Sequence, residues 1–356
     1  MLRRLGEADI QRRSFLTNAA YSVAAAALPL GIEEAIERGQ RGQHTGPRAG
    51  RAEIEAVRDM TDLFTRIDER HGGQHGRTAV VQYLRSDVAD LCRATFASDE
   101  DRAEALSAAA SVAYLCGWKA YDASEHGLAQ RYYLQAYALT REAGDDLHAA
   151  WILRILAHNG MDIRRPESTL ELADAALARI KGKAAPATES LFAITRARAL
   201  ANAGRGKEAA RQVRAAQDLV LSGSADELPV WAARWGSPRA TVASHTAKTF
   251  HALGDHANAE RHYAASARNR PRTGHERITA LTLAAQGREQ AAQGHVEAAC
   301  GSWGKSLDLL NGVRSARAVD EVAGIRRQLA VFGRRGMRAA HDLDERARIW
   351  QAAHAA

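Results

Sequence analysis

The chain is poor in the residues that hold small secreted folds together. Its 356 residues include three cysteines and seven prolines, and 6% of them are aromatic. Cys92, Cys116 and Cys300 are far apart in the sequence and odd in number, which argues against a disulfide framework and fits a reducing compartment. Because proline and β-branched runs are scarce and alanine is abundant, the composition favours an all-helical protein.

Signatures of common catalytic and metal sites are also missing. The sequence has no Cys-x-x-Cys pair, no His-Glu-x-x-His motif and no Gly-x-Ser-x-Gly motif. His71 and His75 are four residues apart, but three glycines between 72 and 76 oppose a helix there, so a structured turn is favoured over a metal site. We therefore expect no metal, no cofactor and no enzymatic activity.

The charge of the chain is moderate. A formal net charge of +7 comes from arginines scattered among nearly as many acidic residues. This pattern indicates a solvated helical surface with a slight preference for acidic partners. A nucleic-acid groove would need the basic residues to gather on one face.

The N-terminal segment allows two interpretations. Residues 11–17, Gln-Arg-Arg-Ser-Phe-Leu-Thr, are close to the twin-arginine export consensus, and an apolar run follows from about 19 to 30. That run is too short for a bilayer span, which takes ~20 residues, but it suits a signal-peptide core. Against export, no clear Ala-x-Ala cleavage site appears, and residues 29–34 lead directly into another helical stretch. The alternatives are export and a cytoplasmic protein whose apolar helix docks on the remainder of the chain.

We expect three segments along the chain. Residues 1–38 would be an N-terminal apolar helix with the twin-arginine-like motif, and residues 39–52 a polar, glycine-rich linker. Residues 53–356 would form one repeat domain, in which helical periodicity continues nearly to the end.

One spacing recurs in this last segment: a small residue, a small residue twelve positions later, a ring or branched residue four later, and a small residue three beyond. The copies are Gly117, Ala129, Tyr133 and Ala136; Ala197, Ala209, Val213 and Ala216; Ala247, Ala259, Tyr263 and Ser266; Gly287, Ala299, Trp303 and Ser306. The spacing is typical of tetratricopeptide repeats, helix-turn-helix units of roughly 34 residues that stack into a right-handed α-solenoid. It predicts a binding surface for a partner rather than a reaction centre.

The spacing also predicts the helices. We expect paired helices at 108–121 with 128–141, 147–159 with 169–180, 187–203 with 206–221, 239–253 with 256–269, and 276–293 with 296–311, closed by capping helices at 319–332 and 339–352. Gly204, Gly254 and Gly294 would end the first helix of their pairs. Trp231 and Trp235 fall in an irregular connection, where they either pack between splayed helices or plug an end of the groove.

Residues 299–306, Ala-Cys-Gly-Ser-Trp-Gly-Lys-Ser, match a permissive phosphate-loop pattern. A phosphate loop needs a strand before it and a helix after it. Here the same residues are second-helix positions of the last repeat, so the match is interpreted as accidental. A switch that binds ATP through Lys305 is the weakest hypothesis.

In such repeats the first helix of each pair lines the concave face. Its expected outward positions are Ser111, Tyr114, Trp118, Tyr121, Arg154, His158, Arg198, Lys248, His251 and Arg288. An aromatic patch followed by basic residues suits an extended or helical peptide with acidic groups. The alternative is that Trp118 and Tyr121 only seal neighbouring repeats.

Three stretches carry a family resemblance. They are Leu115-Cys116-Gly117-Trp118-Lys119-Ala120-Tyr121-Asp122 with His126-Gly127-Leu128-Ala129-Gln130-Arg131-Tyr132-Tyr133, then His71-Gly72-Gly73 through Tyr83-Leu84, and Gly312-Val313-Arg314-Ser315-Ala316-Arg317-Ala318-Val319-Asp320. Together they resemble one actinomycete family, the tetratricopeptide effector region of streptomycete helix-turn-helix transcriptional regulators. The likeness covers roughly residues 53 to 350. In that family the repeats follow a DNA-binding domain, often across an Arg-Arg-x-Phe-Leu and alanine-rich junction similar to this one.

The chain differs from the family in that only about a dozen residues precede Arg12, too few for a helix-turn-helix. We therefore expect no direct sequence-specific DNA binding. The expected function is that of a cytoplasmic, non-enzymatic regulatory protein that binds a peptide, a protein or a small signal in the concave groove. A separate DNA-binding protein is a further possible partner, and an exported adaptor is the alternative.

Overall fold

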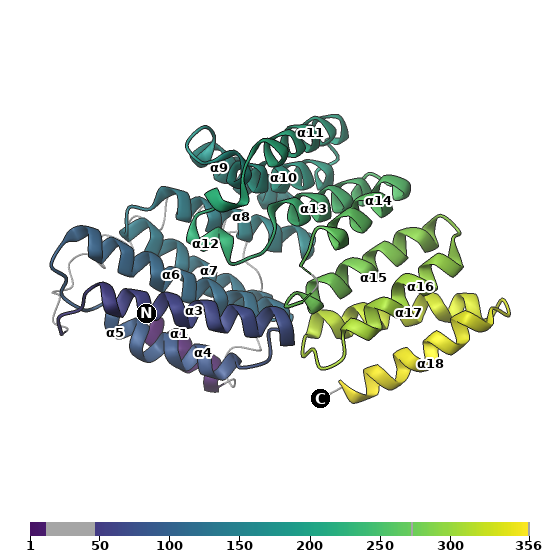
Figure 1. The fold of residues 1–356 in the computed structure, drawn as a ribbon, viewed down its shortest axis with the longest axis horizontal. Coiled ribbons are helices and arrows are strands. Elements are labelled where there is room, and N and C mark those ends of the chain that lie inside the picture. The colour runs from purple at the N-terminus through teal and green to yellow at the C-terminus, as the bar shows by residue number, and fades with distance from the viewer. Residues whose placement is uncertain (12–46, 272, 355–356) are drawn as a thin grey trace. The chain divides into compact units, whose positions relative to one another are not determined.

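The computed structural model describes residues 1–11, 47–271 and 273–354, and these are helical apart from connections and one isolated bridge between Arg48 and Thr95 (Figure 1). The prediction of an all-helical protein is confirmed for this part of the chain. Within it, no helix has both the length and the apolar character that a bilayer span needs. The twin-arginine-like motif from Arg12, the apolar run and most of the expected linker lie outside the described residues.

The described chain divides into two compact units. Unit 1 contains the described residues up to Ile67, then 76–184 and 230–234. Its helices are α1 (Leu2–Gln11), most of α3 (Arg51–His71), α4 (Arg77–Tyr83), a π-helical turn (Leu84–Val88), α5 (Ala89–Leu91), α6 (Asp99–Asp122), α7 (His126–Glu142), α8 (Asp146–Asp162), α9 (Pro166–Ile180) and α12 (Val230–Ala233). Helix α6 packs mainly on α7, α7 also packs on α8, and α8 packs mainly on α9.

Unit 2 contains residues 68–75, 185–229 and those from Trp235 onward. Its helices are α10 (Pro186–Asn202), α11 (Gly206–Ser222), a short 3₁₀ turn (Ala225–Glu227), α13 (Pro238–Ala252), α14 (His256–Arg268), α15 (Glu276–Ala292), α16 (Val296–Leu309), α17 (Ala316–Gly333) and α18 (Arg338–Ala353). Here α10 packs on α11, α13 on α14, α15 on α16 and α17 on α18. The expected helix pairs are therefore present in both units.

The turns inside the pairs follow one geometry. In the turns 123–125, 163–165, 203–205, 253–255 and 293–295, the middle residue has positive φ, and the backbone N–H of the third residue reaches back to the closing helix. Arg205 N–H, for example, donates to Leu200 O at 2.8 Å, and Asp255 N–H donates to Phe250 O at 2.9 Å. This is the Schellman arrangement, which satisfies carbonyls at the end of a helix. It confirms the expected turns at Gly204, Gly254 and Gly294.

Equivalent positions of the repeated spacing make equivalent contacts. Ser266 Oγ–H donates to Ala240 O, and Ser306 Oγ–H donates to Ala280 O, both at 2.8 Å. In the two copies that begin with glycine, the large residue fills the space left by the small one: Tyr133 lies against Gly117 and Trp303 against Gly287. The small residues therefore allow close approach of the two helices in a pair, as the spacing predicts.

The loop with His71 and His75 is a structured turn, as expected. Gly72 has a φ of 91°, and the backbone on both sides of it pairs with residue 314: Arg314 N–H donates to His71 O at 2.8 Å, and Gln74 N–H donates to Arg314 O at 3.2 Å. A Cβ at position 72 would lie 2.2 Å from Arg314 O, so only glycine fits there.

Candidate functional site

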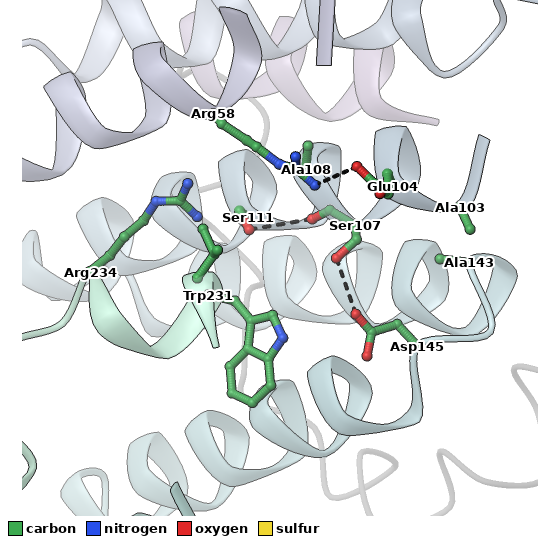
Figure 2. Close-up of a pocket in the computed structure, with 11 residues that line it drawn as sticks. Arg58, Ala103, Glu104, Ser107, Ala108, Ser111, Ala143, Asp145, Trp231 and Arg234 are labelled. Carbon is green, nitrogen blue, oxygen red and sulfur yellow. Dashed lines mark hydrogen bonds and ion pairs between the residues drawn. The ribbon is translucent and has the colours of Figure 1, made fainter. Parts of the chain in front are cut away.

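A cavity of about 300 Å³ with charged, hydroxyl and apolar lining residues lies within unit 1 (Figure 2). Three parts of this unit supply most of its wall: helix α6, the turn between α7 and α8, and the short helix α12 with the residue after it. The lining residues are Arg58, Ala103, Glu104, Ser107, Ala108, Ser111, Ala143, Asp145, Val230, Trp231 and Arg234. Its size is at the lower end of small-molecule sites.

Two arginines bring positive charge to this cavity. Arg58 Nη2 lies 3.0 Å from Glu104 Oε2, so its charge is largely compensated. Arg234 donates from Nε to Asp62, and its side chain is only 8% exposed. Its Nη2 is buried and has no hydrogen-bond partner among the described residues. A buried guanidinium N–H without an acceptor is costly, so a ligand acceptor placed there would be strongly favoured.

Ser107, Asp145 and His148 form a hydrogen-bonded chain beside the cavity. Ser107 Oγ lies 2.9 Å from His148 Nδ1 and donates to Asp145 Oδ2 at 3.2 Å. A hydroxyl has one proton, so the chain is complete when Nδ1–H donates to Ser107 and Ser107 donates to Asp145. The other Asp145 oxygen accepts from the His148 backbone N–H at 2.9 Å and caps α8.

The His148 ring is held neutral. It is buried and stacks on Trp231, with ring centroids 5.5 Å apart and planes 7° from parallel. Burial, with a smaller contribution from the charge of Arg234, lowers the pKa of His148 to about 3. The ring is therefore a very weak base at neutral pH.

This serine–histidine–aspartate group does not have the geometry of a catalytic triad. In a triad the histidine accepts the serine proton and the carboxylate holds the other ring nitrogen. Here the proton order is reversed, and Asp145 bonds the serine and a backbone N–H instead. The arrangement orients Ser107 and the α7–α8 turn rather than activating a nucleophile.

The structure corrects the expected exposure of the groove positions in unit 1. Tyr114, Tyr121, Arg154 and His158 were expected to face outward but are buried, and Trp118 is half-buried. Aromatic side chains of the same helix and of neighbouring helices pack against them, since these rings gain more from packing than from solvent contact. Tyr121 contacts the rings of Trp118 and His158 and donates to Asp162.

Arg154 illustrates the reason for this burial. Its guanidinium carbon lies 4.6 Å from the centre of the Trp151 ring, a cation–π contact. Burial lowers the pKa of Arg154 to about 10. A position that looks basic and outward on a helical projection is thus covered by an aromatic residue three positions before it.

In unit 2 the expected groove positions differ in exposure and in their ion pairs. Arg198 is buried, Lys248 is half-buried, and Arg288 pairs with Glu321. His251 is exposed and meets His256 and Glu289. Ligand binding at these positions stays a prediction.

Sequence reasoning missed most of the cavity residues. Of its lining only Ser111 was among the expected outward positions, and Trp231 had been singled out for its unusual connection. Arg234 lies between Trp231 and Trp235 in the same connection, so an arginine flanked by tryptophans was a usable signal. Glu104 and Asp145 gave no sequence signal of a cavity, because acidic residues are common on exposed helices.

Residues 299–306 are helical and lie within α16. The strand–loop–helix geometry of a phosphate loop is replaced by continuous helix, as the accidental interpretation predicted. Neither protein-family models nor the sequences of curated proteins give a match to this chain.

Proposed function

We propose that this chain is a non-enzymatic regulatory protein of the tetratricopeptide type, a right-handed α-solenoid whose unit 1 cavity binds a carboxylate-bearing ligand. The ligand would be a small molecule or the end of a peptide or protein segment. The observation that carries the proposal is Arg234, which lines the cavity and whose buried Nη2 has no acceptor among the described residues. The paired helices, the recurring turns and the resemblance to regulator effector regions support the class.

The cavity lining suits a ligand that has both acceptors and donors. A carboxylate would accept from Arg234, whereas the Ser111 hydroxyl, which donates its proton to Ser107 O, would offer the ligand an acceptor. Glu104 and Asp145 would accept from an amide or ammonium group. Trp231 and the alanines would cover an apolar portion. A peptide terminus or an amino-acid derivative provides all of these groups.

The proposed regulation follows from the position of α12. Trp231 and Arg234 belong to this short helix and the residue after it, whereas Ser107 and Ser111 are on the long helix α6. A ligand that contacts both would stabilise one position of α12, and a partner that recognises that position would sense occupancy. We propose a cytoplasmic location and a separate DNA-binding protein as that partner.

The test is calorimetric titration with short peptides. N-acetylated dipeptides with a free C-terminal carboxylate would be compared with the same dipeptides amidated at the C-terminus, on the wild type and on Arg234→Gln. We expect the carboxylate forms to bind at least ten-fold more tightly than the amides to the wild type. Arg234→Gln should lose this preference.

The matched control is Arg239→Gln, because Arg239 is an exposed arginine on α13 that does not line the cavity. It should bind like the wild type. Equal binding of acid and amide to the wild type, or an unchanged preference in Arg234→Gln, would remove the cavity assignment.

An exported adaptor remains the alternative, because residues 11–17 are close to the twin-arginine consensus. Fusion of residues 1–40 to a reporter that is active only outside the membrane separates the two proposals. Activity would favour an exported adaptor, and a silent fusion would favour the cytoplasmic regulator.

A further inference from the structure

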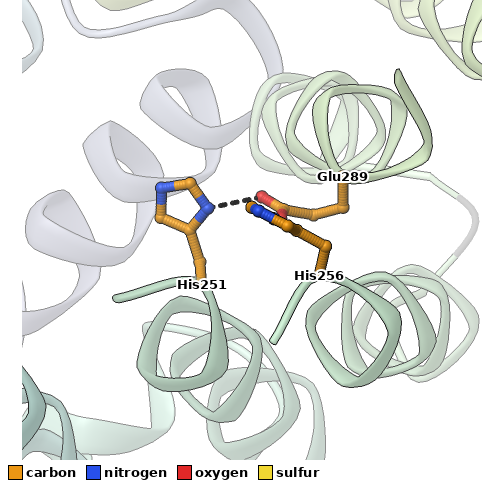
Figure 3. A group of neighbouring side chains, drawn as sticks. All are labelled: His251, His256 and Glu289. Atoms are coloured by element: carbon orange, nitrogen blue, oxygen red, sulfur yellow. Dashed lines mark hydrogen bonds and ion pairs between the residues drawn. The ribbon is translucent and has the colours of Figure 1, made fainter. Parts of the chain in front are cut away.

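His251, His256 and Glu289 meet in unit 2 (Figure 3). His251 is in the last turn of α13, His256 is the first residue of α14, and Glu289 is on α15. The turn at Gly254, with a φ of 76°, brings the two histidines to the same end of their helix pair. The cluster thus joins one helix pair to the first helix of the next.

The contacts within this cluster are short. His251 Nδ1 lies 2.8 Å from Glu289 Oε1, and His256 Nδ1 lies 2.7 Å from Glu289 Oε2. Each carboxylate oxygen therefore faces a different imidazole. One ligand atom from each residue can be chosen so that all three lie within 4.8 Å of one another.

Burial differs between the acid and the histidines. The Glu289 side chain is 1% exposed, whereas those of His251 and His256 are 45% and 39% exposed. Burial alone would raise the pKa of Glu289, but hydrogen bonds and charge from the two histidines outweigh it and lower that pKa. The carboxylate is thus ionised and anchored, and solvent reaches the cluster from the histidine side.

Neighbouring charged groups have hydrogen-bond or ion-pair partners of their own, and Asp255, next to His256 in sequence, accepts from Asn258. Arg288 pairs with Glu321. Glu260 accepts from Gln290 Nε2 at 2.9 Å and from Gln293 Nε2 at 2.7 Å. Arg261 donates to Asn258. The two imidazoles are therefore the groups that directly face the Glu289 carboxylate.

We infer that His251, His256 and Glu289 form a binding site for Zn²⁺ or a similar first-row divalent metal ion. Two imidazole nitrogens and one carboxylate oxygen are a known zinc ligand set, and the fourth position would be open to water. Ligand atoms around tetrahedral zinc lie roughly 3.3 Å apart, given bonds of about 2.0–2.2 Å. Small rotations of the two exposed histidines would bring the present atoms to that spacing.

The ion would take the place of any proton on the two Nδ1 atoms. A neutral ring would then carry its one proton on Nε2, where solvent can accept a hydrogen bond from it. Because the ligands come from α13, α14 and α15, the metal would link neighbouring helix pairs and stabilise unit 2.

The experiment uses the full chain without a polyhistidine tag, freed of metal by a chelator. Co²⁺ is titrated and followed by the visible absorption of tetrahedral cobalt, then Zn²⁺ is added in competition. We expect one equivalent to bind and the melting temperature to rise. His251→Ala and His256→Ala should each weaken binding at least ten-fold, and Glu289→Gln, which keeps the shape of the side chain, should do the same.

His295→Ala is the control, because His295 is an exposed histidine at the next intra-pair turn and is outside the cluster. The two exposed histidine variants are expected to stay folded, which circular dichroism checks, so the test does not depend on the buried glutamate. The inference is overturned if Co²⁺ does not bind at millimolar concentration. It is also overturned if His251→Ala and His256→Ala bind the metal as tightly as His295→Ala.

Discussion

Gly287 and Trp303 fit together with no spare space: a Cβ built on Gly287 would lie 2.5 Å from Trp303 Nε1 and 2.6 Å from its Cδ1. The indole is fully buried, and its Nε1–H donates to Ala284 O at 3.1 Å. The ring therefore lies directly against the backbone of α15. The same relation joins Gly117 to Tyr133, where a Cβ would be 2.7 Å from the tyrosine ring.

Gly287→Ala should therefore destabilise the protein by about 1–3 kcal/mol, because the added methyl group forces the buried indole out of its place. Gly301→Ala is the matched control on α16, since a Cβ there meets nothing within 4 Å. That exchange should stabilise by about 0.5–1 kcal/mol through helix propensity. Chemical denaturation of both variants measures the difference, and equal stabilities would contradict the packing account.

A buried ion cluster in unit 2 leads to a second prediction. The Arg277 side chain is 1% exposed and lies 2.8 Å from Asp68 Oδ2 and 3.3 Å from Glu69 Oε1. Arg277→Met should cost about 3–5 kcal/mol, because it leaves buried carboxylates without their counter-charge. Adding Asp68→Asn and Glu69→Gln should restore part of the loss.

The control for this prediction is Arg348→Met. Arg348 pairs with Glu345 in an exposed position, and such pairs contribute little to stability because solvent screens them. Urea unfolding should therefore separate the two arginine variants clearly. A loss at Arg277 no larger than the loss at Arg348 would show that the buried cluster is not needed for stability.

The lowered pKa of His148 predicts that the folded protein loses stability in acid. Its pKa is lowered from 6.5 to about 3 in the folded protein, so the unfolded chain binds the extra proton first. The stabilisation is present above pH ~6.5 and is lost as the pH falls towards 3. At pH 5 the loss is on the order of 2 kcal/mol.

The measurement compares the free energy of unfolding at pH 7 and pH 5 for the wild type and His148→Asn. Asparagine keeps a donor near Ser107 but does not titrate, so the variant should lose most of the difference between the two pH values. Glu289, whose pKa is also lowered, adds the same pH dependence of the free energy of unfolding to both proteins. The same pH dependence in both would mean that His148 is not the group responsible.

The helices and turns could be predicted closely because their signals are local. The expected helix 206–221 is observed at Gly206–Ser222, and the expected helix 276–293 at Glu276–Ala292. Gly204 and Gly254 mark turns, and the pair Gly287 and Trp303 marks a contact at a fixed spacing. Such features depend on neighbouring residues and on helical geometry alone.

The cavity could not be predicted in the same way, because it depends on which distant segments cover which helices. Arg234 reaches the cavity from a connection that is more than a hundred residues from Ser107 in sequence. The outward positions on α6 and α8 were assigned from helical periodicity, which does not reveal that aromatic side chains cover Arg154 and Tyr121. The histidine–glutamate cluster was missed because its three residues come from three helices.

A last prediction concerns Arg164, which has a φ of 59° at the turn where Gly204, Gly254 and Gly294 occupy the same place in other pairs. A left-handed conformation costs a non-glycine residue about 1–2 kcal/mol, and substitution by glycine removes this cost. Part of the gain is lost because glycine has more conformational freedom in the unfolded chain. Arg164 is exposed, so its side chain contributes little. Arg164→Gly should therefore stabilise the protein by about 0.5–1 kcal/mol. The neighbouring exchange Arg165→Gly, at a φ of −112°, is the control and should not stabilise the protein. Thermal melting of the two variants makes the comparison. Equal melting temperatures for both would mean that Arg164 is not strained at this turn.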